Sequence, residues 1–199
     1  IQQPHPPIWI PGSGSIETIR WVAERRYPFI ALPFSPIQVM KEHYDTLREY
    51  SSTTLGEEVP PERLGWPVIV YVSDTDEKAR KEFEPHFWYL AKKCLRMPRE
   101  YMFPPGHTSV ESLTRVTGTK RKFVTMLTSW DEVEEGLYAV VGSPATVREK
   151  MREALKMTGC GIVQGVFQVG SMPHEQAMRN MELFAKEVMP HLREEFPGA

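Results

Sequence analysis

The chain alternates short apolar runs with longer segments in which apolar residues recur every three or four positions. Four apolar runs have the length and composition of strands, which we predict at residues 8–10, 28–33, 67–73 and 162–169. Helical periodicity follows them, and we predict helices at residues 15–26, 35–50, 74–94, 145–157 and 173–192. This order is typical of parallel βα units, so the pattern predicts an α/β fold with four such units.

Two segments lack this periodicity. Residues 51–65 are predicted to form a loop. Residues 96–130 contain several prolines and glycines and a basic cluster from Lys120 to Lys122, and we expect an irregular insertion there. Such a long insertion is either functional or a solvated surface excursion. The last predicted helix places an apolar stripe toward the core, made of Ala177, Met181, Phe184, Val188 and Leu192.

Composition narrows the class of protein. The 199 residues are enough for one domain with a buried core, and the formal net charge of −2 does not favour nucleic acid as a partner. No apolar run approaches the roughly 18 residues of a membrane span, and no signal peptide precedes residue 8. Cys94 and Cys160 are predicted to be buried thiols in a reducing compartment. We therefore expect a cytoplasmic protein without membrane contact, and the absence of a starting Met indicates a segment of a longer polypeptide.

The most informative segment covers residues 7–18, PIWIPGSGSIET, where a strand enters a Gly/Ser turn and then a helix. Backbone amides and hydroxyls gather there at the positive end of the helix dipole, which suits a phosphate or a carboxylate. Two interpretations stay open. Ser15 is only a helix cap in a tight turn, or the amides of Gly14 and Ser15 and the hydroxyls of Ser13, Ser15 and Thr18 bind a phosphate.

Short polar segments, including this Gly/Ser turn, follow the carboxyl ends of the predicted strands. Folds built from βα units have their active sites at these strand ends. Four units fit either an open sheet or one half of an eight-stranded barrel with unpaired outer strands. The pattern alone does not choose between these two architectures.

Several segments resemble the C-terminal half of the luciferase-like, flavin-dependent monooxygenases. They are PIWIPGSGSIETIRWVAERRYPFIALPF, VIVYVSDTDEKAR, VVGSPATVREKM and TGCGIVQGVFQVGSMPHEQAMRNMELFAKEVMPHL, and they extend over residues 7–192. The resemblance implies a TIM-barrel (βα)8 fold, of which residues 1–199 form one partial domain with strands five to eight. It also implies that the insertion after strand seven is a lid, which the basic cluster would help to close on anionic groups.

With Trp21 setting the register, the resemblance places the phosphate-binding serine at Ser15 and a threonine at Thr18. The implied cofactor site is the turn and the first helical turn after it: Gly12, Ser13, Gly14, Ser15 and Thr18. No catalytic residue is assigned, although His107 in the insertion is the one histidine worth testing for catalysis. The histidines have no metal-ligand spacing, and no metal site is expected.

The implied activity is oxygenation of a small organic substrate with reduced FMN and dioxygen. This half would contribute the phosphate anchor, the lid and one wall of the pocket, and we expect little turnover from it alone. Its expected partner is the N-terminal half of the barrel or a second chain, including a second copy. Two alternatives remain: a deazaflavin-dependent oxidoreductase with the same barrel, and a non-catalytic flavin-binding or assembly module.

Overall fold

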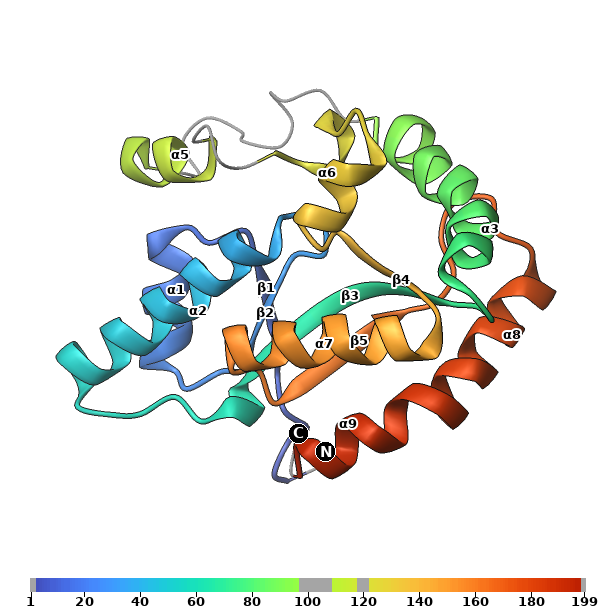
Figure 1. Ribbon diagram of the computed structural model, residues 1–199. Coiled ribbons are helices and arrows are strands. Elements are labelled where there is room, and N and C mark those ends of the chain that lie inside the picture. The colour runs from blue at the N-terminus through green and yellow to red at the C-terminus, as the bar shows by residue number, and fades with distance from the viewer. Residues whose placement is uncertain (1–2, 97–108, 118–121, 198–199) are drawn as a thin grey trace.

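The computed structural model of the chain describes residues 3–96, 109–117 and 122–197. Within these residues, one parallel sheet lies at the centre and helices pack around it (Figure 1). Its strands are β1 (Ile10–Gly12), β2 (Phe29–Ala31), β3 (Leu64–Val72), β4 (Ala139–Gly142) and β5 (Ile162–Val166).

The helices alternate with these strands. They are α1 (Ile16–Glu24), α2 (Ile37–Tyr50), α3 (Asp76–Tyr89), α5 (Val110–Thr117), α6 (Trp130–Glu135), α7 (Pro144–Thr158), α8 (His174–Leu183) and α9 (Met189–Glu195). Short π-helical turns extend α2 over Ser51–Leu55 and α3 over Leu90–Cys94, and another over Phe184–Val188 joins α8 to α9. Two 3-10 turns cover Pro61–Arg63 and Val124–Met126.

The pairing register gives the order of the strands. Gly65 of β3 pairs with Ile30 of β2 and with Ile162 of β5, so β2 and β5 lie on opposite edges of β3. Further along, Ile69 pairs with residues of β4 and β5, so β4 shares the β2 edge. The strands β1, β2, β3 and β5 therefore lie side by side in chain order, as in one half of a (βα)8 barrel, and β4 is an additional short strand.

Strand β3 is the centre of the core, and all nine of its residues are buried. Its even-numbered side chains, from Leu64 to Val72, pack in one cluster with α1, α2 and α7. The side chains of Ile69 and Tyr71 belong to a second cluster that contains Phe83 of α3 and Trp130 of α6. Helices thus cover both faces of β3, which explains its continuous apolar sequence.

The four predicted strands are confirmed with shifted ends, but the expectation of only four strands is wrong. The fifth, β4, has four residues and is defined by its pairing with β3, a tertiary contact that local patterning does not reveal. The loop expected at residues 51–65 is also partly wrong, because Ser51–Leu55 is helical and Leu64 already belongs to β3. The helix ending near Cys94 is confirmed.

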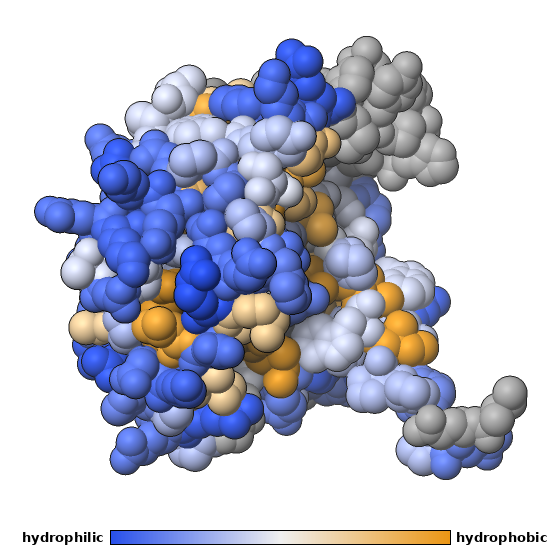
Figure 2. Space-filling model, turned by 90° about the vertical axis from the view of Figure 1, so that its right-hand side faces the viewer, coloured by the Kyte–Doolittle hydropathy of each residue, from blue (hydrophilic) through white to orange (hydrophobic). Residues whose placement is uncertain are grey.

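Two burial predictions are wrong. Cys160 is buried beside Tyr44, but Cys94 is exposed, because it ends the Leu90–Cys94 turn on the same solvent-facing side as Lys92 and Lys93. On the last helix, Met181 is 37% exposed, and α8 packs on the sheet through Ala177 and Asn180 instead. Figure 2 shows this side of the molecule: polar side chains cover most of it, and apolar groups come to the surface between them.

No helix in the described part of the chain is both long and apolar enough to cross a lipid bilayer.

Candidate functional site

The Gly/Ser turn lies at the carboxyl end of β1, which ends at Gly12, and leads directly into α1. Ser15 is the N-cap residue: its Oγ accepts a hydrogen bond from the Thr18 amide at 3.3 Å and donates one to Thr18 Oγ1 at 2.8 Å. The side chain of Ser15 therefore has the capping role expected from sequence, and Thr18 lies beside it one helical turn later.

Two glycines allow the turn to pass close to its neighbours. Gly14 is buried with φ at +89°, in the left-handed region that favours glycine. A Cβ atom at Gly12 would lie 2.7 Å from the ring of Phe29, so β1 and β2 approach closely where β1 ends. The half-buried Ser13 lies between them. All five residues predicted for the cofactor site are thus contiguous in space at one strand end.

The turn presents unused donors. Among residues 3–96, 109–117 and 122–197, no acceptor is paired with the backbone amides of Ser13, Gly14 or Ser15. These amides stand at the positive end of the α1 dipole, where an anion is stabilised. Gly14 is buried, so water offers it little compensation, and an unpaired buried amide is costly.

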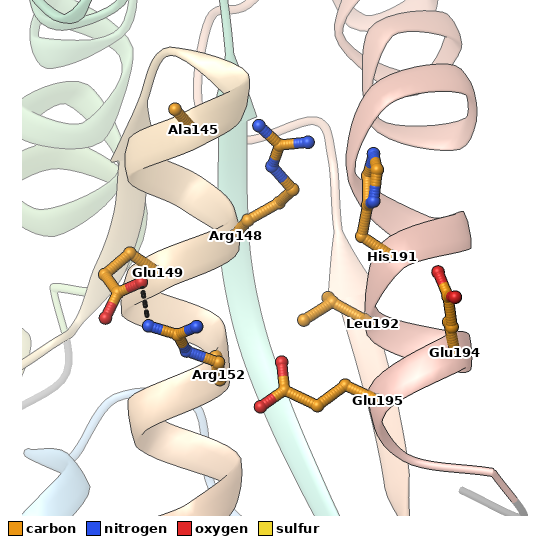
Figure 3. A pocket seen from close by; sticks show the side chains of 8 residues that line it. All are labelled: Ala145, Arg148, Glu149, Arg152, His191, Leu192, Glu194 and Glu195. Atoms are coloured by element: carbon orange, nitrogen blue, oxygen red, sulfur yellow. Dashed lines mark hydrogen bonds and ion pairs between the residues drawn. The ribbon is translucent and has the colours of Figure 1, made fainter.

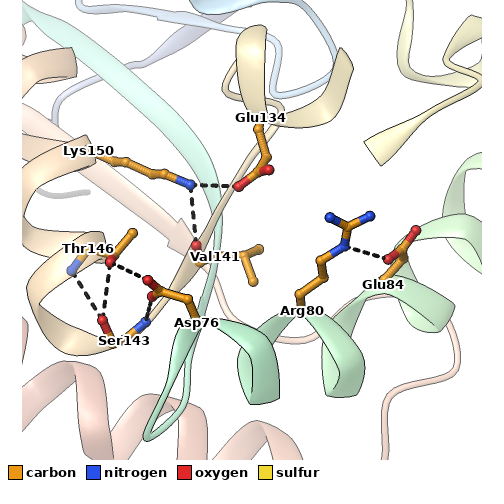
Figure 4. Close-up of polar contacts among 8 residues, drawn as sticks. All are labelled: Asp76, Arg80, Glu84, Glu134, Val141, Ser143, Thr146 and Lys150. Carbon is orange, nitrogen blue, oxygen red and sulfur yellow. Dashed lines mark hydrogen bonds and ion pairs between the residues drawn. The ribbon is translucent and has the colours of Figure 1, made fainter. Parts of the chain in front are cut away.

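Helix α7 begins with the same Ser-x-x-Thr arrangement, and there the polar groups of the serine and the threonine are hydrogen-bonded within the protein (Figure 4). Ser143 caps the helix by accepting from the Thr146 amide at 3.4 Å, and its hydroxyl donates to Thr146 Oγ1 at 3.1 Å. The carboxylate of Asp76 then accepts from the Ser143 amide at 2.6 Å and from the Thr146 hydroxyl at 2.9 Å. These bonds, above all the one from the Ser143 amide, lower the pKa of Asp76.

The comparison of the two helix starts shows what the turn at α1 can hold. At α7 an internal carboxylate takes the amide of the capping serine and the hydroxyl of the threonine. At α1 no carboxylate of the described residues accepts from the Ser15 amide or the Thr18 hydroxyl. The same pair of donors is therefore available to an external anion. Position N1 adds a third amide at α1, because Ile16 has an amide hydrogen where Pro144 has none, but in this structure that amide donates to Ser112.

Helix α5 contacts this site from the insertion. The hydroxyl of Ser112 accepts from the Ile16 amide at 3.2 Å and donates to Glu17 Oε2 at 2.6 Å. Hydrogen bonds from Ser109 and Ser112 lower the pKa of Glu17 to about 2. Glu17 thus stays ionised in the first turn of α1, which the helix dipole also favours.

The remaining residues singled out from the sequence belong to the insertion or are histidines. His107, Lys120 and Arg121 lie outside the described residues. Lys122 forms an ion pair with Glu132, and this pairing with hydrogen bonds from Thr128 lowers the pKa of Glu132 to about 2. In the described ranges, no three or more His, Cys, Asp or Glu side chains are arranged to hold a metal ion.

A separate groove of about 490 Å³ lies between α7 and α9. Arg148 and Arg152 project into it from α7, and His191 and Glu195 from α9 (Figure 3). Arg152 pairs with Glu149, and Glu195 pairs with Lys156, so positive and negative charges balance. None of the residues that line it comes from the strand ends, and we do not assign it to catalysis.

Sequence reasoning missed two residues: Ser112, which accepts from the Ile16 amide at α1, and Asp76, which occupies the matching position at α7. Ser-x-x-Thr occurs at both residues 15–18 and 143–146, so the sequence does show that the two helix starts are alike. The partners Asp76 and Ser112 are 67 and 96 residues away from Ser143 and Ile16, so no local pattern points to them.

The model of a protein family described as luciferase-like monooxygenase matches residues 1–160. No curated protein sequence matches the chain. Among solved structures, the chain is similar to the FMN-bound oxygenating constituent of 3,6-diketocamphane monooxygenase from the CAM plasmid of Pseudomonas putida. The identity is 21% and the TM-score 0.66, over 93% of this chain and 49% of that one.

A monooxygenase from Streptomyces bottropensis is similar at 19% identity and a TM-score of 0.65, over 96% of this chain and 50% of that one. The coenzyme F420 dependent tetrahydromethanopterin reductase from Methanopyrus kandleri has 17% identity and a TM-score of 0.55, over 93% and 50% of the two chains. At these identities the likeness concerns the fold. The chain spans about half the length of the structures that it resembles.

Proposed function

Because this chain belongs to the luciferase-like monooxygenase family, we propose that it supplies the cofactor-phosphate anchor of a flavin-dependent monooxygenase. The complete enzyme would use reduced FMN and dioxygen to oxygenate a small organic substrate. The chain has the TIM-barrel type of α/β fold, at about half the length of its structural neighbours. Residues 1–199 would then be one partial domain that forms the C-terminal half of the barrel.

The observation that supports the anchor is the pair of matched helix starts. At α7 the amide of a capping serine and the hydroxyl of a threonine hold the carboxylate of Asp76. We assign the equivalent donors at α1, the Ser15 amide and the Thr18 hydroxyl, to an oxygen of the flavin phosphate. Gly12, Ser13 and Gly14 bring the backbone close enough to offer further amides. A phosphate carries more negative charge than the carboxylate at α7, so the same donors hold it at least as well.

When bound, reduced FMN supplies the reaction with dioxygen that oxygenates the substrate. The residues of this chain bind and orient the cofactor by its phosphate end and form one wall of the pocket at the carboxyl ends of β1, β2, β3 and β5. The apolar cluster around Ile69, Tyr71 and Phe83 keeps water away from the sheet on the α3 side. No catalytic side chain is assigned to this half.

The remaining strands would come from the N-terminal half of the barrel or from a second chain. In the described part of the sheet, β3 is the only partner of β5, so the other edge of β5 is open. Beside it lies an apolar groove of about 290 Å³, lined among others by Ile162, Val163, Phe167, Phe184 and Phe196. An open edge next to an apolar groove favours association with further βα units.

Binding of FMN and riboflavin to the chain tests the phosphate anchor, because the two ligands differ only by the phosphate. We expect FMN to bind at least tenfold more tightly. Ser15→Ala should reduce this preference severalfold through loss of the hydroxyl and disorder of the cap. Ser143→Ala is the matched control, since it removes the same kind of cap from α7 and should leave the preference unchanged. Equal binding of FMN and riboflavin would contradict the anchor.

One neighbour uses coenzyme F420, so a deazaflavin is the second candidate cofactor. Cofactor extraction and an absorption spectrum of the complete enzyme distinguish a flavin from a deazaflavin. Turnover provides a further check: steady flavin-dependent oxygenation by the purified 199-residue chain alone would contradict the role of half an active site.

A further inference from the structure

Helix α5 lies over the start of α1 (Figure 1). One fully buried side chain, that of Ser112, joins the two helices. Ser112 is 0% exposed, accepts from the Ile16 amide at 3.2 Å and donates to Glu17 at 2.6 Å. Ser109 supports this contact, because its hydroxyl accepts from the Ser112 amide at 3.1 Å. The insertion thus touches α1 at the donor next to Ser15.

The attachment of α5 is polar. Val110 and Leu113, the apolar residues of its first turn and a half, are 82% and 38% exposed, so this described part of α5 is held with little apolar burial. A hydrogen bond contributes about 1 kcal/mol net, and a few such bonds are easily exchanged for others. A stronger ligand for the Ile16 amide can therefore displace α5 from this position.

An anion at the α1 start requires that amide. The dipole of the helix and the amides of its first turn act together on a bound phosphate, and the first available helical amide after the capping Ser15 is that of Ile16. In this structure the Ser112 hydroxyl takes it. The neighbouring Glu17 carboxylate, which α5 holds, also repels a second anion.

We propose that α5 blocks the cofactor-phosphate site of the free protein, with Ser112 as the competing group, and that phosphate binding displaces it. The inference rests on the proposed function, because it requires the phosphate to bind at α1. A phosphate dianion forms charge-assisted hydrogen bonds, which are stronger than the bond from the amide to a neutral hydroxyl. The competition raises the observed Kd by the reciprocal of the fraction of molecules in which α5 leaves the site free.

The first test measures FMN and riboflavin binding to the chain and to Ser112→Ala. Removal of the competing hydroxyl should tighten FMN binding about fivefold, the equivalent of one hydrogen bond, and leave riboflavin binding unchanged. Thr114→Ala is the matched control, because Thr114 lies on the same helix and its hydroxyl bonds only to Val110 O in the described structure. This control should bind both ligands like the parent chain.

The second test follows amide hydrogen exchange in α5 with and without FMN, and with inorganic phosphate as a probe without the flavin ring. We expect the amides of Ser112 and Leu113, which donate to Ser109 in this structure, to lose protection when either ligand binds. Unchanged protection in α5 on binding would overturn the displacement.

The outcomes separate the two proposals. If the parent chain prefers FMN but Ser112→Ala binds FMN no more tightly than the parent, the anchor is retained and the competition is overturned. If Ser112→Ala binds FMN more weakly, Ser112 is itself a phosphate ligand. Equal affinities for FMN and riboflavin in every variant overturn the anchor, and the competition with it.

Discussion

The imidazole ring of His43 lies directly behind Gly14: a Cβ atom on Gly14 would be 2.0 Å from His43 Nε2. His43 is buried in α2, and Gly14 has a positive φ of +89°. The turn that would bind the phosphate is therefore held against a side chain that comes 29 positions later in the sequence. Glycine is required here both for the backbone conformation and for the contact.

Gly14→Ala should destabilise the protein by roughly 3 kcal/mol, because the strained φ and the overlap with His43 act together. Gly56→Ala is the matched control: Gly56 also has a positive φ, +68°, but apart from its chain neighbours no atom of the described residues lies within 4 Å of the position of its Cβ. Gly56→Ala should lower the free energy of unfolding by about 1 kcal/mol, because only the backbone conformation is unfavourable there. Urea denaturation measures both, and equal costs would show that the His43 contact tolerates a methyl group.

Asn180 should be the most sensitive polar residue of α8. It is 0% exposed, and it accepts from the Val72 amide and donates to Val70 O and Phe167 O. The β3–β5 ladder ends at Ile69 and Val166, so Asn180 takes the place of the missing strand partner. Asn180→Ala should cost about 3 kcal/mol, since it leaves buried backbone groups unpaired.

Gln176→Ala is the control on the same helix. Its half-buried side chain donates to Glu82 O at 3.1 Å and also bonds with Tyr71, but no buried backbone group of β3 depends on it, so its loss should cost about 1 kcal/mol. Thermal or urea unfolding followed by circular dichroism compares the two variants. A similar cost for both would contradict the strand-capping role of Asn180.

Asp76 should make stability depend on pH in the acid range. Its folded-state pKa is lowered below the ordinary 3.8, first by the Ser143 amide. A lowered carboxyl pKa contributes stability that is complete above the unfolded value and is lost as the pH falls through the folded one. Asp76→Asn should therefore be less stable than the parent above pH 4, and this difference should shrink below pH 3.8.

The control for this variant is Asp74→Asn. Asp74 forms an exposed ion pair with Lys78, and such pairs contribute at most about 1 kcal/mol. Its removal should change stability little at any pH between 3 and 7. Denaturant unfolding of the three proteins across this pH range gives the comparison, and parallel pH profiles of parent and Asp76→Asn would contradict the capping of α7 by Asp76.

The two cysteines should differ sharply in reactivity. Cys94 is exposed, whereas Cys160 is 5% exposed and burial raises its pKa, which lowers the fraction of reactive thiolate. A thiol reagent should modify one cysteine quickly in the native protein and the second only after unfolding. Cys94→Ser should abolish the fast phase, and a fast phase that survives in this variant would place Cys160 at the surface.

The contact between α5 and α1 should weaken in acid. Ser109 and Ser112 lower the pKa of Glu17 from 4.5 to about 2, so the contact is complete above pH 4.5 and is lost as the pH falls toward 2. The chemical shift of the Ser112 amide should follow this titration. In Glu17→Gln the shift should stay constant over the same range, and a parent-like titration there would assign the change to another group.

The sequence predicted much of the fold because β3 and the amphipathic helices carry strong local patterns. All nine residues of β3 are buried, and α7 follows its Ser-Pro start for four full turns, so apolar runs and capping residues were sufficient to locate them. The short strand β4 was not predicted, since four residues become a strand only through their pairing with Ile69 to Val72.

For the candidate site, the sequence alone determined that a Gly/Ser turn joins the first strand to a helix capped by Ser15, because φ preferences and capping depend on adjacent residues. Only the tertiary structure decided what surrounds this turn. His43 fixes it from behind, Ser112 takes the Ile16 amide, and Asp76 reveals at α7 what such a helix start binds. These partners are 29 to 96 residues away, and contacts over such separations follow from the packing of the whole sheet.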